Sequence, residues 1–388
     1  MKKIYLDNAA TTQVDERVSK VVKLYFDEKY GNASSLHIKG QEAKLALEES
    51  RHVIAKSIYA KDDEIIFTSG GTESNNLSIK GLAFSNPDKK HIITTKIEHD
   101  CVLNACKWFE GRGYEVTYLN VDKEGFIDLD ELKSSIRKDT LLVSVIHGNN
   151  EIGVIQDLEK IGKICKENHV LFHTDACQSY KKTELDVQKQ NLDLVTLNAH
   201  KIHGPKGVGA LYIKRGIKIT PLVHGGGQEK NIRSGTENIS GIVGFAEAVR
   251  VAKKIDIEKM TKLRDKLING LEKIKGSQLN GPSGNNRLCN NINFSFEGVE
   301  GEAVGGYLDA EGICSSTGSA CSSKSLEPSH VLIAIGLKPE QAHGSLRLSL
   351  SRFNTEEEID KTLEVLPKII EKLRKISPFE KIINRVIK

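Results

Sequence analysis

The 388-residue sequence predicts an α/β fold in two domains, a large domain with a mostly parallel sheet and a smaller α+β domain towards the C-terminus. Two observations indicate this. Between about residues 60 and 215, short apolar runs alternate with stretches of helical periodicity. After Gly235 the alternation stops. We place the large domain at residues 15–256 and the small domain at residues 1–14 and 257–388.

Seven apolar runs in the first region have the length and composition of strands. They are EIIFT (64–68), HIITT (91–95), EVTYL (115–119), LLVSVI (141–146), VLFHT (170–174), LVTL (194–197) and VGALYI (208–213). Helices are expected between them, beginning near Thr72 and near Leu158. Ligands of such sheets bind at the carboxyl ends of the strands, so we expect the functional residues just after these runs.

The second region has fewer strands. The sequence predicts one helical stretch over about 241–275, strands at NNINFSF (290–296) and SLRLSL (345–350), and a charged helix from Thr355. A short helix is expected to begin at Glu327–Pro328, because proline suits the first helical turn.

Composition excludes several classes of protein. The 56 basic and 52 acidic residues nearly balance and form no basic block, so no nucleic-acid partner is expected. No apolar run approaches the roughly 20 residues of a membrane span, and MKKIYLDNAATT turns polar too early for a signal peptide. The seven cysteines show neither a disulfide framework nor metal-ligand spacing. We therefore expect a cytoplasmic protein with reduced thiols and no metal.

Three strand ends carry polar groups. FTSGGTESNN (67–76) opens a helix whose free N–H groups suit a phosphate, although an ordinary capped helix explains the segment equally well. Asp175 ends another strand and needs a cationic partner, which a structural salt bridge would also supply. Lys201 follows a third strand, and alone it would be read as a solvated lysine. Together the three match pyridoxal phosphate, which needs a lysine imine, a carboxylate at its ring nitrogen and a phosphate site.

Cys321 lies in the polar run STGSACSS. A structural cysteine usually has apolar neighbours, whereas serine and glycine favour a flexible chain. We expect a mobile loop over about residues 315–324 whose essential side chain is the Cys321 thiol, while Cys314, which follows an apolar residue, is expected to be structural.

Ten motifs follow one another in a characteristic order. They are YLDNAATT, FTSGGTES, EHDCVL, HGNNEIGVIQD, HTDACQS, AHKIHGPKGVGALY, HGGGQE, RSGTEN, STGSACSS and LEPSHVL. This order resembles the cysteine desulfurases, in the class-V branch of the fold-type-I pyridoxal phosphate enzymes. The long segment around Cys321 is similar to the subgroup that supplies sulfur for iron–sulfur clusters and tRNA thiolation.

The resemblance implies a role for each matching residue. Lys201 forms the imine with the cofactor, His99 stacks on the ring and moves protons, and Cys321 takes the sulfur of L-cysteine as a persulfide. The remaining cofactor-binding residues are Gly71, Thr72, Asn150, Asp175, Gln178, Asn198, His200 and Thr236, of which Thr236 reaches the partner subunit of a homodimer. The substrate-binding residues are Asn32, Asn150 and Arg347, whose guanidinium suits the substrate carboxylate.

Two positions depart from the family pattern. Asn198 stands where the family has a serine that binds the phosphate, and an amide can also donate a hydrogen bond. Cys177 stands where the family has threonine or valine, and we interpret it as a packing residue.

The expected function is therefore desulfuration of L-cysteine to L-alanine, with transfer of the sulfur to an iron–sulfur scaffold protein or another acceptor. One alternative is an aminotransferase or selenocysteine lyase of the same fold, although an aminotransferase needs no mobile cysteine. The other is a non-catalytic scaffold in sulfur transfer, which the presence of Lys201, Asp175, His99 and Cys321 disfavours.

Overall fold

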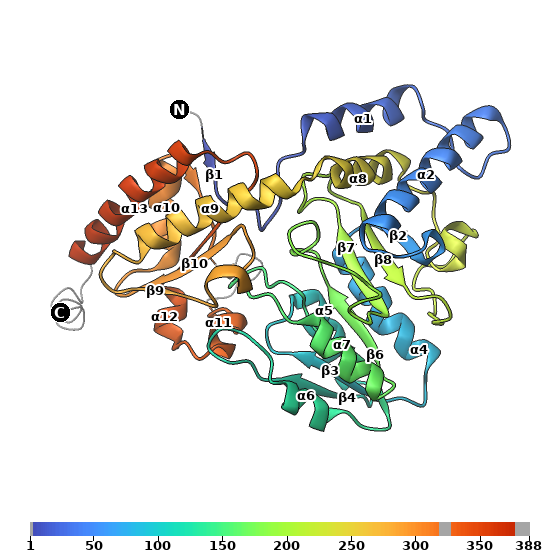
Figure 1. The fold of residues 1–388 in the computed structure, drawn as a ribbon, viewed down its shortest axis with the longest axis horizontal. Helices are drawn as coiled ribbons and strands as arrows, with labels where there is room; N and C mark the ends of the chain where they lie inside the picture. Colours follow the sequence, from blue (N-terminus) through green and yellow to red (C-terminus); the bar gives the residue numbers. More distant parts are fainter. Residues whose placement is uncertain (1–2, 318–326, 377–388) are drawn as a thin grey trace.

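The computed structural model describes residues 3–317 and 327–376. Cys321 and its neighbours at 318–326 lie outside the described residues. Figure 1 shows two lobes, and the long helix α9 (Lys254–Leu271) lies along the smaller lobe and points towards the larger one. The larger lobe holds the central sheet and the smaller lobe holds most of the C-terminal third of the chain.

The larger lobe is built on a seven-stranded sheet with the order β2-β8-β7-β6-β5-β3-β4. Its strands are β2 (Ile65–Thr68), β3 (His91–Thr95), β4 (Glu115–Leu119), β5 (Thr140–Ser144), β6 (Leu171–Asp175), β7 (Leu194–Asn198) and β8 (Gly209–Ile213). Strand β8 runs antiparallel to β2 and β7, and the other pairs are parallel. The predicted mostly parallel sheet is confirmed, and each strand overlaps its predicted run.

Helices cover both faces of this sheet. One face carries α2 (Ile38–Ser57), α6 (Leu129–Ser135), α7 (Leu158–Glu167) and α8 (Ile239–Val251), with α1 (Glu16–Asp27) packed on α8. The other face carries α5 (Asp100–Glu110) and a continuous helical segment formed by α3 (Gly71–Asn76), η2 (Leu77–Gly81) and α4 (Leu82–Ser85). Successive strand residues point to opposite faces, so Ile65 and Phe67 enter the first core and Ile66 the second.

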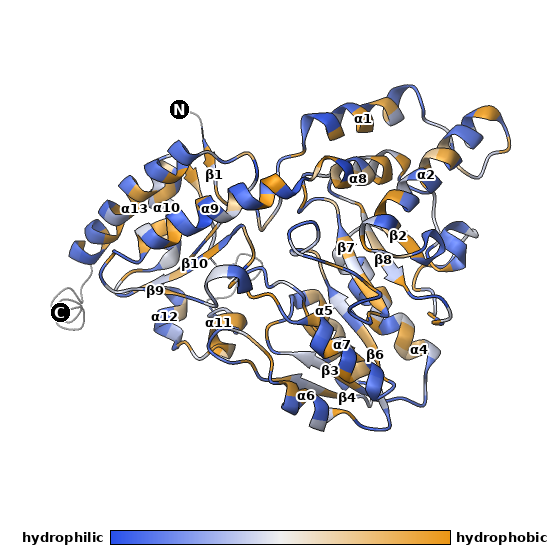
Figure 2. Ribbon diagram, in the orientation of Figure 1, coloured by the Kyte–Doolittle hydropathy of each residue, from blue (hydrophilic) through white to orange (hydrophobic). Residues whose placement is uncertain are grey.

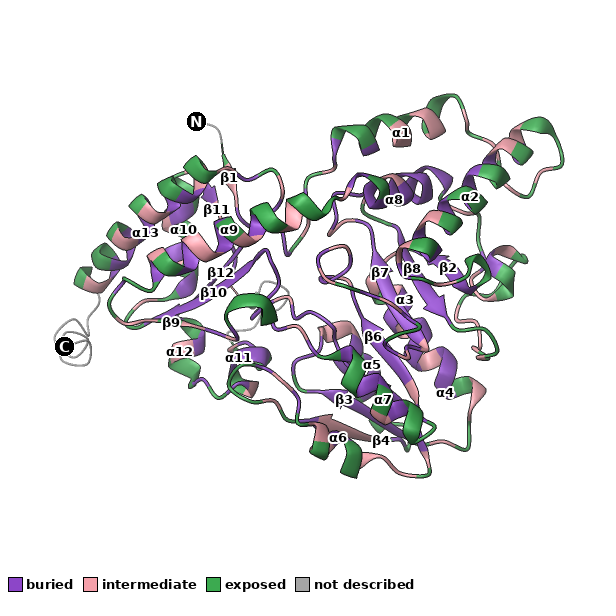
Figure 3. Ribbon diagram, viewed as in Figure 1, coloured by how far each residue is buried: buried purple, intermediate pink, exposed green. Residues whose placement is uncertain are grey.

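Burial follows from this layering. Figure 3 shows the strands of the central sheet buried along most of their length, except the edge strand β4, which is largely intermediate. In Figure 2 helix α8 is apolar around most of its surface, because it packs against α1 and α2 as well as the sheet. Helices on the outside, such as α7, are apolar on the side that faces the core.

The smaller lobe has its own sheet and core. Strands β9 (Ser277–Leu279), β10 (Asn291–Phe296) and β12 (Ser345–Ser349) pair antiparallel in the order β12-β10-β9. Helices α9, α10 (Gly301–Ala310) and α13 (Glu356–Ile376) pack with them. Strand β1 (Ile4–Tyr5) pairs with β11 (Ile313–Cys314), and Leu6 enters this core, so the N-terminal segment belongs with the C-terminal residues.

The prediction of one helical stretch over about 241–275 is wrong, because the stretch is divided into α8 and α9. Ala252 and Lys253 have extended backbone, with ψ of 124° and 153°. The side chain of Asp256 accepts a hydrogen bond from the Lys253 N–H at 3.1 Å and so starts α9. Helix α8 packs in the core of the large sheet and α9 in the core of the smaller lobe, so the break separates two cores.

The predicted helix start at Glu327–Pro328 is also wrong. Helix α11 (His330–Ala334) begins at His330, because the hydroxyl of Ser329 accepts from the Leu332 N–H and acts as the N-cap. A further short helix, α12 (Pro339–His343), follows it. Before the undescribed residues, Ser316 exchanges two backbone hydrogen bonds with Arg347 at 2.7 and 3.1 Å, so the chain is paired with β12 as far as Ser316.

Across residues 3–317 and 327–376, none of the helices combines the length and the apolar character needed to cross a membrane.

Candidate functional site

The polar strand ends meet at one edge of the central sheet. Strands β6 and β7 are parallel neighbours and end in Asp175 and Asn198. Helix α3 begins beside them, since a Cβ atom at Gly71 would lie only 2.6 Å from Sγ of Cys177 and 3.7 Å from Nδ2 of Asn198. Only glycine allows this approach. The structure therefore brings together the helix start and the strand ends that the sequence singled out.

Asp175 is a buried carboxylate held by neutral donors. Its Oδ2 accepts from Nδ2 of Asn75 at 2.7 Å, and its Oδ1 accepts from the Cys177 N–H at 2.9 Å. Among the residues that the structure describes, no basic side chain lies within ion-pair distance of this carboxylate. The structural salt bridge considered from the sequence is therefore wrong. A buried carboxylate of this kind is suited to a cationic ligand.

Lys201 follows β7 and lies under the N-terminal segment. Its Nζ donates to the carbonyl oxygens of Ala9 and Ala10, the latter at 2.7 Å. Nε2 of Gln178 donates to the Ala9 carbonyl at 2.8 Å. The backbone around Ala9 thus holds Lys201 and Gln178 at one place.

His200 is uncharged at neutral pH. Burial, with a smaller contribution from the neighbouring Lys201, lowers the pKa of His200 to about 4. Its Nδ1 lies 3.2 Å from Oγ1 of Thr11. His200 can therefore offer a hydrogen bond to a phosphate, but no positive charge.

His99 is the N-cap of α5, at the end of the loop that follows β3. Its Nδ1 accepts from the Cys101 N–H at 3.2 Å and lies 3.0 Å from Sγ of Cys101. Burial raises the pKa of the preceding Glu98 to about 8, so this carboxyl group carries a proton at neutral pH. Oε1 of Glu98 accepts from Thr95 and from the Ile146 N–H, which fixes the loop.

The expected substrate residues Asn150 and Arg347 come together from the two lobes. Arg347, on β12, is almost fully buried, and its Nη1 donates to the Asn150 carbonyl at 3.2 Å. Its Nη2 donates to Oδ1 of Asp7 at 3.0 Å, while its Nε has no acceptor among the described residues. An unpartnered guanidinium donor at this position suits a carboxylate.

Asn32 and Thr236 lie on the surface. Oδ1 of Asn32 accepts from the Ser34 N–H at 2.9 Å, and Thr236 precedes α8. In the described part of this chain neither side chain is hydrogen-bonded to the residues named above. Thr72 follows Gly71 in α3.

Sequence reasoning missed two contributors to the site. Asn75 holds Asp175 and lies four residues after Gly71, so one helical turn places both on the same side of the helix. The four-residue spacing between Gly71 and Asn75 is the signal in the sequence that could have identified Asn75 as a site residue. Asp7 contacts Arg347 from the N-terminal segment, and no local pattern relates two residues so far apart in sequence.

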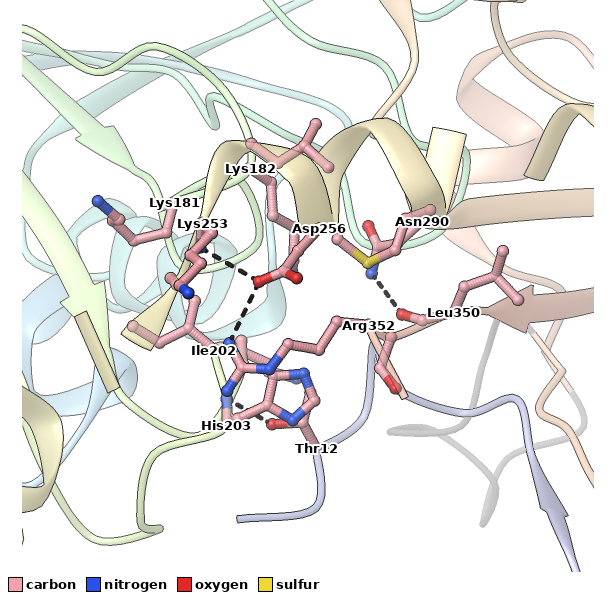
Figure 4. Close-up of a pocket in the computed structure, with 15 residues that line it drawn as sticks. Thr12, Lys181, Lys182, Ile202, His203, Lys253, Asp256, Asn290, Leu350 and Arg352 are labelled. Carbon is pink, nitrogen blue, oxygen red and sulfur yellow. Dashed lines mark hydrogen bonds and ion pairs between the residues drawn. The ribbon is translucent and has the colours of Figure 1, made fainter. Parts of the chain in front are cut away.

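A small cavity, lined in part by Lys201, lies between the lobes (Figure 4). Arg352 and Asp256 face each other there at 3.7 Å, and Asn290 donates to the Leu350 carbonyl at 3.2 Å. The volume of about 30 Å³ holds only one or two water molecules. The cavity is too small for a cofactor, and Asp175 and His99 are not among its lining residues.

The residues at the sheet edge fit pyridoxal phosphate. Asp175 is buried with no ion-pair partner in the described part of the chain, an amine is present at Lys201, and α3 starts with the glycine that allows its close approach to β7. The buried Oδ1 of Asn198 also has no hydrogen-bond partner among the described residues. Buried polar atoms are normally hydrogen-bonded, so this atom indicates a place for a polar ligand. Within residues 3–317 and 327–376 no three histidine, cysteine or acidic side chains converge as metal ligands would.

Comparisons with known proteins agree with this geometry. A model of the family described as aminotransferase class-V matches residues 4–362. The chain is 54% identical to a protein named cysteine desulfurase IscS from Dictyoglomus turgidum, over 98% of this chain and 97% of that protein. Among solved structures, a NifS-like protein superposes with a TM-score of 0.90 at 40% identity, covering 95% of this chain and all of that one. Another, described as SspA in complex with cysteine, has a TM-score of 0.82 at 39% identity, covering 91% of this chain and all of that one.

Proposed function

The chain belongs to the class-V aminotransferase family and, within it, to the cysteine desulfurases, and from this premise we propose how its residues remove sulfur from L-cysteine. The observation that carries the proposal is the buried Asp175 carboxylate, which has no ion-pair partner among the described residues and ends β6 beside the strand that precedes Lys201. The product is L-alanine, and the sulfur leaves on an enzyme cysteine.

We assign pyridoxal phosphate to this sheet edge. When bound, the cofactor supplies an electron sink that allows bonds at the carbons of the amino acid to break. Asp175 keeps a proton on the ring nitrogen, and the N-terminus of α3 with Thr72 and Asn198 donates to the phosphate. His200 adds a neutral hydrogen bond.

The remaining residues orient the substrate and move protons. Arg347 binds the substrate carboxylate through its guanidinium, with Asn150 beside it, and its Nε has no acceptor among the described residues. Lys201 anchors the cofactor and moves a proton at Nζ, and Gln178, which contacts the same backbone segment, orients the ring. His99 holds a proton at Nε2, because its Nδ1 is occupied by the Cys101 N–H.

Cys321 accepts the sulfur. Its thiolate attacks the sulfur atom of the substrate, so an S–S bond forms as the C–S bond breaks, and the carbon skeleton leaves as L-alanine after gaining a proton. One thiol and one cysteine give one persulfide and one alanine, so no outside oxidant or reductant is needed. Cys321 lies outside the described residues, and its role rests on the family motif.

Asp175→Asn is expected to lower turnover about 10²- to 10³-fold, because a neutral amide no longer keeps the ring nitrogen protonated. The substitution preserves volume, and the new side chain keeps an oxygen that can accept from Nδ2 of Asn75. The measurement is L-alanine formed from L-cysteine with added pyridoxal phosphate and no keto acid.

Two controls make this a test of the function. Wild-type protein should release alanine and sulfur in equal amounts without a keto acid, whereas a requirement for a keto acid would indicate an aminotransferase. Asp175→Asn protein should keep the melting temperature of the wild type within a few degrees. Turnover at the wild-type rate in that variant would show that the carboxylate does not serve the cofactor.

Asn198 gives a second prediction, because it replaces the serine of the family. Asn198→Ser should retain the cofactor as wild-type protein does, since a hydroxyl also donates to a phosphate. Asn198→Ala should weaken retention about 2- to 10-fold, the effect of one hydrogen bond. Cofactor absorbance after dialysis measures both. Equal retention by all three proteins would show that the amide of Asn198 does not bind the phosphate.

We further propose a homodimer as the working form. Large apolar side chains that are exposed around α1 and α2 support it, because such a patch on one chain marks an interface. They are Phe26, Tyr30, Leu36, Ile38 and Leu45. Thr236 and Asn32 are also exposed, which supports contacts to a partner subunit.

The acceptor of the sulfur and the location belong to the same proposal. The name IscS of the relative and the long cysteine segment support delivery to an iron–sulfur scaffold protein or to tRNA thiolation. The six cysteines among the described residues are free thiols, which supports a reducing compartment such as the cytoplasm.

A further inference from the structure

We propose that Cys101 is a positioning residue for His99, and that with Asn75 it joins His99 to Asp175 in one hydrogen-bonded chain. The chain has three links. Nδ1 of His99 lies 3.0 Å from Sγ of Cys101, the same sulfur lies 3.1 Å from Nδ2 of Asn75, and that nitrogen lies 2.7 Å from Oδ2 of Asp175. The inference rests on the proposed function, which gives His99 and Asp175 their roles.

The positions of the hydrogens follow from the donors. The Cys101 N–H points at Nδ1 of His99 at 3.2 Å, and a backbone amide cannot give up its proton. Nδ1 must therefore offer a lone pair, and the neutral ring carries its hydrogen on Nε2. The thiol of Cys101 is then the second donor to Nδ1.

The other end of the chain is equally determined. Nδ2 of Asn75 has two hydrogens, one for the Asp175 carboxylate and one for Sγ of Cys101. The opposite orientation of the amide would direct its oxygen at the carboxylate, which is unfavourable. The thiol of Cys101 thus accepts from Asn75 and donates to His99. Each hydrogen in these three hydrogen bonds has one acceptor.

This arrangement has a consequence for proton uptake. A second proton on the ring of His99 must go to Nδ1, where two donors already point. Hydrogen bonds that a neutral group accepts disfavour its charged form. Cys101 therefore holds His99 in the neutral form with its hydrogen on Nε2, and it fixes the orientation of the ring.

Other titratable groups flank the hydrogen-bonded chain from His99 to Asp175 and are the same in each variant below. They are Glu98 and Asp100, which are neighbours of His99 in sequence, Cys177 and Lys201 near the Asp175 end, and His330 of α11, whose Nε2 lies 3.0 Å from the Glu98 carbonyl. A difference between variants at Cys101 consequently reports the loss of its thiol.

The test is the titration of the His99 ring in the cofactor-free protein, followed by NMR with ¹⁵N-labelled histidine. His99→Gln identifies its signals among those of the 12 histidines. In wild-type protein below the midpoint of titration both ring nitrogens carry hydrogen, and above it only Nε2 should. Cys101→Ala should shift the midpoint upward by about half a pH unit, the effect of one weak hydrogen bond.

Two variants keep the result interpretable. Cys101→Ser retains both a donor and an acceptor, so its midpoint should return to within about 0.2 pH unit of wild type. Cys106→Ala removes a buried thiol from the same helix without touching His99, and it should leave the midpoint unchanged. The acidic limb of the pH profile of kcat in the holoenzyme should move with the NMR midpoint, while KM for L-cysteine stays unchanged.

An unchanged midpoint in Cys101→Ala, or the same shift in Cys106→Ala, would overturn the proposal. Failure of the serine variant to restore the midpoint would also overturn it. Because the titration needs no cofactor and no turnover, its result is independent of whether the chain desulfurates cysteine.

Discussion

Lys201→Ala should lose turnover by at least about 10²- to 10⁴-fold, the range for removal of a group that transfers a proton. In the proposed mechanism this amine anchors the cofactor and moves a proton at the substrate, and no other described residue of the site offers an amine at the end of β7. L-Alanine release measures the loss. Borohydride treatment of the holoenzyme followed by peptide mapping should place the cofactor on Lys201 in wild-type protein and leave the variant unlabelled.

Lys182 is the matched control for this experiment. It is buried close to the same site, its Nζ donates to the Gln178 carbonyl at 2.8 Å, and burial lowers its pKa to about 8. It is therefore the other amine with the chemistry of a nucleophile. Lys182→Met should still carry the cofactor on Lys201. A label on Lys182 in wild-type protein would refute the assignment.

The strands of the large sheet could be predicted because their signal is local. Most are short runs of buried, largely apolar residues, and β5 and β8 are buried at every position, whereas the edge strand β4 is only partly buried. The break between α8 and α9 had no such signal, since neither glycine nor proline occurs at Ala252–Lys253. It is set by the two helices packing in different cores, which is a property of the tertiary structure.

The site shows the same division. Asp175 and Lys201 follow predicted strands, so their meeting at one sheet edge could be expected from topology. The chain from Asp175 through Asn75 and Cys101 could not, because it joins β6 to two helices by side chains. The local sequence pattern predicts where a strand or helix ends. It does not predict which side chains of other elements contact that end.

The burial of the other cysteines bears on which thiol accepts the sulfur. Burial raises the pKa of Cys165 to about 12 and of Cys289 to about 11, and it raises the pKa of Cys106 and Cys177 as well. These four groups stay protonated at neutral pH, and a thiol attacks sulfur only as the thiolate. The burial of Cys177 and its close approach to Gly71 support its interpretation as a packing residue rather than a second nucleophile.

Cys321→Ser should lower turnover on the order of 10³-fold or more, as removal of a catalytic nucleophile does, while cofactor binding stays intact. A serine hydroxyl is not ionised at neutral pH and does not take sulfur from a thiol, so no protein-bound persulfide should form. Mass spectrometry of peptides after brief treatment with L-cysteine measures the added sulfur. The absorption change on adding L-cysteine should persist, because Arg347 and Lys201 are unaltered.

Cys314→Ser and Cys101→Ser are the controls, since these are the two described cysteines outside the group of four. Cys314 belongs to β11, where its carbonyl accepts from the Leu6 N–H at 2.8 Å, so its position is set by pairing with β1. Both variants should form the persulfide on Cys321 in wild-type yield. If wild-type protein instead carries the added sulfur on Cys314 or Cys101 and none on Cys321, that cysteine is the sulfur acceptor and the assignment of Cys321 is wrong. Only a thiol that reaches the substrate can take its sulfur.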